Sequence, residues 1–253
     1  MKLGFMSSVC PKMSLSELIS TATTYGYAGI EFRVQWDHGH GVELETPKAE
    51  LKQKRKQLAD SGIEASCLAT GDRFCDDEAD KRNACNDELL KMIDLAATMG
   101  IPRLRIFGDP LPEDPSVRAQ NRARQRDHLA PLAEAAKNAG VTLCLETHGN
   151  MTGTDVADVI APVNSPALRA LWHPLHPCRE KEALEITWSK ISEYVDHCHM
   201  SVDEHATAQR NHEYFNLLNH NNFNGYQSVE IIDPPDSIAV IKEYADHYKQ
   251  FSG

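Results

Sequence analysis

The hydrophobic positions of the chain follow two alternating patterns. Short apolar runs typical of buried strands recur between longer segments with the period of amphipathic helices. The expected strands are 2–6, 28–32, 63–69, 103–107, 141–146, 168–172, 195–200 and 226–232, and the expected helices are 14–24, 47–60, 77–99, 116–138, 152–160, 180–192, 209–219 and 237–248. Strands that alternate with helices in this way predict a parallel sheet. Eight such pairs with no leftover segment predict an α/β fold, a (β/α)8 barrel forming a single domain over residues 1–253.

Local signals support these boundaries. Ser14 followed by Glu17 is a capping box for the first helix, and Gly26 is expected to end it. In the charged helix 47–60, Leu51 and Leu58 are expected to face inward. An open doubly wound sheet is the alternative fold, but no GxGxxG or P-loop motif follows the first strand.

Polar residues stand at or near the ends of the last four predicted strands. They are Glu146, His173, His199 and Glu230, at spacings of 26 to 31 residues. A lone Glu there can cap a helix, and a lone His is usually structural. Four such residues at the carboxyl ends of barrel strands, where these folds carry their active sites, predict one shared metal site. His197 can also face inward because side chains alternate along a strand, but His199 is nearer the rim and is the expected ligand.

Further polar residues near strand ends have two interpretations. Arg33 and Arg105 either clamp substrate oxygens or form structural ion pairs. In the loop after the second strand, Trp36, His38 and His40 either form a lid over a small substrate or belong to a solvated loop. For the two histidines, the solvated loop is the favoured interpretation.

Composition narrows the class of protein. The chain has 26 basic and 37 acidic residues and a net charge of −11, which disfavours a nucleic-acid partner. Its seven cysteines include no CxxC pair, which argues against a disulfide framework or a thiolate zinc site and favours reduced thiols, mostly in the core. No apolar run is long enough to predict a membrane partner. The apolar segment 3–6 is too short for a secretory signal, so a cytoplasmic location is expected.

Several segments carry a resemblance to a known family. They are Leu3-Gly4-Phe5, Gly29-Ile30-Glu31, Leu143-Cys144-Leu145-Glu146, Trp172-His173-Pro174-Leu175-His176, His197-Cys198-His199 and Ser228-Val229-Glu230. Over nearly its whole length the chain resembles the xylose isomerase-like TIM barrel superfamily. This group of sugar epimerases and isomerases includes tagatose 3-epimerase and inosose dehydratase.

The resemblance implies a divalent metal held by Glu146, His173, His199 and Glu230, and a substrate contact from His176. The family usually has Asp where this chain has His173. Two carboxylates and two neutral imidazoles balance a divalent cation and favour Mn²⁺, Zn²⁺ or Co²⁺ over Mg²⁺. With His176, the residues expected to contact substrate are Arg105, Trp36 and His148.

The implied activity is isomerisation or epimerisation of a sugar, sugar phosphate or cyclic polyol through an enediolate. Glu146 and Glu230 are the expected catalytic residues, one removing a proton from carbon and the other returning it. A dehydratase acting on a keto-polyol such as an inosose, and a non-catalytic metal or sugar binder, are the alternatives. A phosphodiesterase acting at abasic DNA would need further ligands, and 68–70 offers none. The oligomeric state stays open.

Overall fold

The computed structural model describes residues 1–174, 181–200 and 208–251, and for residues 208–211 it describes the backbone alone. The chain forms a closed barrel of eight parallel strands. The strands are β1 Lys2–Met6, β2 Gly29–Arg33, β3 Glu64–Arg73, β4 Arg103–Phe107, β5 Thr142–Glu146, β6 Leu168–Trp172, β7 Val195–Met200 and β8 Tyr226–Val229. Each strand pairs with the next, and β8 closes the barrel by pairing with β1. This architecture confirms the predicted (β/α)8 fold.

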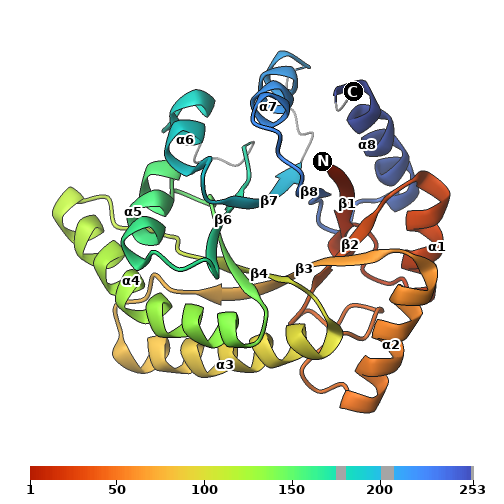
Figure 1. Cartoon of the computed structure of the whole chain (residues 1–253), viewed down its shortest axis with the longest axis horizontal. Helices are drawn as coiled ribbons and strands as arrows, with labels where there is room; N and C mark the ends of the chain where they lie inside the picture. Colours follow the sequence, from red (N-terminus) through yellow and green to blue (C-terminus); the bar gives the residue numbers. More distant parts are fainter. Residues whose placement is uncertain (175–180, 201–207, 252–253) are drawn as a thin grey trace.

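A ring of helices surrounds the strands (Figure 1). The helices are α1 Leu15–Tyr25, α2 Lys48–Ser61, α3 Ala79–Met99, α4 Pro115–Asn138, α5 Gly153–Val163, α6 Leu184–Ile191, α7 Ala208–His220 and α8 Ser237–Phe251, and the short 3₁₀ helix η1 spans Ser7–Val9. Among the described helices, none combines the length and the apolar character that crossing a membrane requires.

Helix α1 shows how local sequence sets an element boundary. The Ser14 side chain accepts a hydrogen bond from the Glu17 backbone N–H, and the Glu17 carboxylate accepts one from the Ser14 N–H, which confirms the capping box. Gly26 ends the helix at φ 78°, a left-handed backbone conformation that costs residues with a Cβ atom free energy.

Helix α2 packs on the barrel through a narrow apolar stripe. Leu51 and Leu58 are each 3% exposed, as expected, while most other side chains of this charged helix meet solvent. Burial of each leucine contributes about 1.5–3 kcal/mol. Two residues two turns apart thus fix the face of a helix that otherwise has little apolar surface.

The structure corrects three of the predicted boundaries, two of which bear on the site. Strand β3 continues to Arg73 because its register shifts after Ala69, which lets Arg73 pair with Phe107 of β4. Strand β8 ends at Val229, so Glu230 is the first residue beyond it. Helix α6 begins at Leu184. The residue two before it, Glu182, accepts hydrogen bonds from Thr154 and Thr187 instead of continuing the helix.

The cysteines follow the expected pattern. Cys10, Cys67, Cys144 and Cys198 are buried free thiols, Cys75 and Cys85 are partly buried, and Cys178 lies outside the described residues. Burial raises the pKa of the Cys67 and Cys144 thiols well above the ordinary value, so both stay protonated at neutral pH.

Candidate functional site

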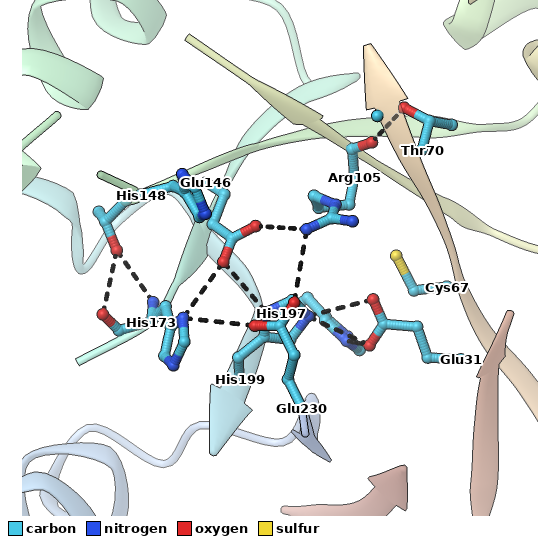
Figure 2. A network of polar contacts seen from close by, with 12 residues as sticks. Glu31, Cys67, Thr70, Arg105, Glu146, His148, His173, His197, His199 and Glu230 are labelled. Atoms are coloured by element: carbon cyan, nitrogen blue, oxygen red, sulfur yellow. Dashed lines mark hydrogen bonds and ion pairs between the residues drawn. The ribbon is translucent and has the colours of Figure 1, made fainter. Parts of the chain in front are cut away.

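Four strand ends carry the predicted ligands to one point. Glu146 is the last residue of β5, His173 follows β6, His199 lies in β7, and Glu230 follows β8. One donor atom from each of these side chains lies within 4.8 Å of the others. Figure 2 shows the carboxylates of Glu146 and Glu230 turned toward the imidazole rings of His173 and His199.

Nitrogen and oxygen donors alternate within this group. The Nδ1 atom of His199 lies 3.1 Å from Glu146 Oε1 and 3.0 Å from Glu230 Oε2. The Nδ1 atom of His173 lies 3.3 Å and 3.4 Å from the same two oxygen atoms. Both imidazoles therefore point Nδ1 at one pair of carboxylates, a convergence that suits coordination of a cation.

Glu31 of β2 is a site residue that the sequence reasoning missed. Its Oε1 lies 3.1 Å from His199 Nε2, and its Oε2 lies 2.9 Å from His197 Nε2. All three side chains are fully buried. The signal was present, because Glu31 is an acid inside an apolar strand, the criterion that singled out Glu146.

The charged groups of the site shift one another's pKa values. Burial alone would lower the pKa of His199, but the carboxylates of Glu230, Glu31 and Glu146 raise it well above the ordinary value. Burial raises the pKa of Glu146, and His199 and Arg105 overcome this and lower it well below the ordinary value. The pKa of Glu230, raised by burial, is lowered by His199 to about 2. The carboxylates are therefore ionised at neutral pH.

This donor set is suited to a divalent cation. A neutral imidazole has a single N–H, yet carboxylates face both ring nitrogens of His199. The three carboxylates of Glu31, Glu146 and Glu230 stand against one guanidinium, that of Arg105, which leaves two negative charges when the imidazoles are neutral. Uncompensated buried charge is costly, and a divalent cation beside Nδ1 would balance it.

Arg105 forms a structural ion pair, one of the two roles that the sequence predicted for it. Its Nη1 donates to Glu146 Oε2 at 2.9 Å, and its guanidinium lies 4.0 Å from the centroid of the Phe107 ring. Although buried, the side chain also borders the cavity above the ligands. Arg105 thus orients Glu146 and remains within the wall of that cavity.

A cavity of about 470 Å³ reaches two of the four predicted ligands. Trp36 and His148 line it, together with His173 and Glu230. His148 is held by Asp109, whose Oδ1 lies 3.0 Å from His148 Nδ1, and by Phe107 at 4.4 Å between ring centroids. The expected substrate contact His176 lies outside the described residues. A larger cavity of about 630 Å³ lies between the 41–47 segment and α3 and includes none of the four ligands.

The solvated-loop interpretation of His38 and His40 was wrong. His40 is fully buried and His38 is 8% exposed. The Nδ1 of His40 accepts a hydrogen bond from the Val42 N–H, so its Nε2 donates to the Arg33 carbonyl. His38 Nδ1 lies 3.1 Å from the hydroxyl oxygen of Ser7. The histidines hold the loop after β2 against the barrel instead of facing solvent.

The longer β3 adds no ligand. Its buried Asp72 has a pKa raised by burial to about 6, but it belongs to neither of the two donor groups found among the described residues. Those groups are Glu146, His173, His199 and Glu230, and Glu31, His197 and His199. Within the described part of the chain, β3 therefore supplies none of the further ligands that a multi-metal phosphodiesterase would need.

The chain is similar in fold to several proteins of known structure. No curated protein matches the sequence. Solved structures that match include D-psicose 3-epimerase in the presence of D-fructose, at 17% identity and a TM-score of 0.80 over 100% of both chains. L-ribulose 3-epimerase matches at 17% identity and 0.80, over 99% of this chain and 94% of that one. The IOLI protein with a bound zinc atom matches at 18% identity and 0.79, over 100% and 96%.

At these identities the structures show a shared fold. The family model described as xylose isomerase-like TIM barrel matches residues 19–251, which is most of the chain. The ring of eight strands and the match over this length agree with the expectation drawn from the strand-end motifs. The chain therefore belongs to the xylose isomerase-like TIM barrel family.

Proposed function

We propose that the protein is a divalent-metal-dependent isomerase or epimerase that moves a proton at the carbon beside the carbonyl group of a carbohydrate. One observation carries the proposal: Glu146, His173, His199 and Glu230 converge at the open end of the barrel, and two of them, His173 and Glu230, line a cavity there. Barrel enzymes carry their chemistry at this end. The similar structures named as sugar 3-epimerases support the same class of reaction.

The metal would be held by these four side chains, with His199 and His173 offering Nδ1. The pairing of two imidazoles with two carboxylates favours Mn²⁺, Zn²⁺ or Co²⁺. A bound divalent ion would supply Lewis-acid polarisation of the substrate carbonyl and its neighbouring hydroxyl. Glu31 would fix the ring of His199 from behind, by accepting the Nε2 proton at 3.1 Å.

The two glutamates differ in their surroundings. Glu146 is fully buried and its Oε2 is held by Arg105, while Glu230 is 15% exposed and borders the cavity. On this proposal one carboxylate removes the proton from carbon. The other carboxylate takes up a proton from water or from a substrate hydroxyl and delivers it to the opposite face, which inverts that carbon. Return of the proton to the neighbouring carbon would give isomerisation instead.

The cavity suits a small polar substrate. Its volume of about 470 Å³ lies within the range of ligand pockets. Trp36, 42% exposed at the rim, offers a flat apolar surface, and His148 offers a ring held by Asp109. We assign substrate contacts to Trp36, His148 and Arg105, and to His176 as the resemblance implies.

Solvent deuterium incorporation tests the proposal. Metal-loaded protein is incubated in D₂O with ketohexoses, ketopentoses and inososes, and the products are followed by NMR. Incorporation at the carbon beside the carbonyl, with a new epimer or isomer, is the expected result. Loss of water with formation of an unsaturated product would assign a dehydratase. A metal-loaded protein that exchanges no proton in any of these compounds would be a binder and not an enzyme.

A further inference from the structure

Among the described residues, three arginines line the cavity at the mouth of the barrel, and one of them differs from the others. Arg73 pairs with Asp109 at 3.0 Å, and Arg105 pairs with Glu146 at 2.9 Å. Arg33, the last residue of β2, borders the same cavity, but its guanidinium has no ion pair or side-chain hydrogen bond with any residue of the described segments. The guanidinium of Arg33 instead stacks on an aromatic ring, and its Cζ lies 3.7 Å from the centroid of the Trp36 ring.

The ring beneath Arg33 is held firmly in place. The residues on either side of Trp36, Gln35 and Asp37, adopt φ values of 77° and 52°, which non-glycine residues keep only when the surroundings enforce them. The Gln35 side chain donates to Glu88 and accepts from the Gly71 N–H. Gly71 has no Cβ, and one placed there would lie 3.0 Å from the Trp36 ring. The chain thus fixes an aromatic platform at the rim.

No carboxylate of the described segments forms an ion pair with Arg33, although the charge of Glu230 acts on it. A bound divalent cation would make the group of Arg105 and the carboxylates of Glu31, Glu146 and Glu230 neutral, and Arg73 is matched by Asp109. The whole chain carries −11, so a positive residue left over at the mouth is a local exception. Burial and the nearby Arg105 lower the pKa of Arg33, and the charge of Glu230 offsets part of this effect, so the guanidinium is partly removed from water without a close acidic partner among the described residues.

We infer that Arg33 is a specificity-determining residue for an anionic substrate, a ketose bearing a carboxylate or phosphate group. A guanidinium presents N–H donors in a planar fork that matches two oxyanion oxygens, and stacking on Trp36 leaves that edge available. The inference rests on the proposed function, because Arg33 shares its cavity with His173 and Glu230. The reacting carbon would lie over the ligands and the oxyanion at the rim.

Three sugars that differ only at carbon 6 test the inference: D-fructose, D-fructose 6-phosphate and D-fructuronate. Binding to Mn²⁺-loaded protein is measured by calorimetry for the wild type and for Arg33→Gln and Arg33→Lys. Arg169→Gln is the matched control, because Arg169 also stands over a ring, that of Tyr194 at 5.8 Å, but does not line the cavity.

At least one of the two anions should bind the wild type about ten- to a hundredfold more tightly than D-fructose, the range expected for hydrogen bonds to a charged group. Arg33→Gln should remove that preference without weakening D-fructose, Arg33→Lys should restore part of it, and Arg169→Gln should keep all of it. The tighter anion identifies the group as phosphate or carboxylate.

Two results would overturn the inference while the proposed function stands. One is that D-fructose binds or exchanges its proton, but neither anion binds more tightly than D-fructose. The other is an anion preference that survives in Arg33→Gln. Absence of binding by all three sugars to metal-loaded protein would count against the ketose reaction itself, and the inference would fall with it.

Discussion

Glu31 Oε1 lies 3.1 Å from Nε2 of His199, on the opposite side of the imidazole from Glu146 and Glu230. This contact assigns the Nε2 proton of a neutral His199 to Glu31 and leaves the Nδ1 lone pair directed at the ligand group. If the proposed metal binds at this group, Glu31 acts as a positioning residue for His199 and not as one of the four predicted ligands.

Glu31→Gln should weaken divalent metal binding about ten- to a hundredfold, because the amide can present its N–H₂ to His199 and no longer selects one tautomer. Competition with a chromogenic chelator measures the affinity. Glu64→Gln is the matched control: Glu64 pairs with Lys2 at 2.6 Å, away from the ligand group, and its loss should leave metal affinity unchanged. Equal affinities for wild type and Glu31→Gln would remove Glu31 from the site.

His173→Asp should keep a metal site but shift its preference toward harder cations. A third carboxylate replaces a neutral nitrogen donor, which favours Mg²⁺ or Mn²⁺ relative to Zn²⁺. Competition of Zn²⁺ against Mn²⁺ in both proteins measures the shift. Unchanged selectivity would mean that His173 does not coordinate the ion.

Glu146→Gln and Glu230→Gln should separate proton transfer from metal binding. The amide oxygen still coordinates weakly, but it cannot accept a proton at neutral pH, so turnover should fall at least about a hundredfold in the presence of excess metal. Turnover and proton exchange in D₂O are measured for each metal-loaded variant. If the glutamates serve opposite faces, one variant should exchange the proton of a single epimer. Near-normal turnover in either variant would leave that glutamate as a ligand alone.

His40 should make the protein less stable in mild acid. Burial lowers the pKa of His40 to about 3, whereas the unfolded chain has the ordinary value of about 6.5. Between these two pKa values the unfolded state binds a proton that the folded state excludes. The free energy of unfolding therefore decreases as the pH is lowered, by at most about 1.4 kcal/mol per pH unit. That stability is fully present above pH ~6.5.

Urea unfolding at pH 7, 6 and 5 measures this slope in the wild type and in His40→Asn. The variant is less stable at every pH because it loses the bonds to Val42 and Arg33, but its slope should be shallower. Parallel curves for the two proteins would mean that His40 titrates alike in both states.

The sequence was informative where a residue's environment follows from its own strand. Glu146, His173, His199 and Glu230 could be predicted because each marks the rim end of an apolar run, and barrel closure necessarily brings those ends together. The helix caps were equally local. These features need only periodicity and turn chemistry.

Relations across the barrel could not be read in this way. The link between Glu31 and His197 spans 166 residues of sequence, and it depends on how far each side chain lies from the rim. The burial of His40 depends on a loop folding back onto Arg33, and the extension of β3 depends on a register shift against β4. Polar composition made the 35–41 loop look solvated, although His40 satisfies backbone groups of Val42 and Arg33 and His38 contacts the Ser7 hydroxyl.

The most direct test of the account is the metal content of the protein after incubation with Mn²⁺ or Zn²⁺ and removal of free metal, measured by elemental analysis. The wild type should retain about one divalent ion per chain. His199→Ala should lose most of it with its circular dichroism spectrum unchanged, because His199 contacts both carboxylates that converge on the site. A wild-type protein that retains no divalent ion, or a His199→Ala variant that retains as much as the wild type, would contradict the account.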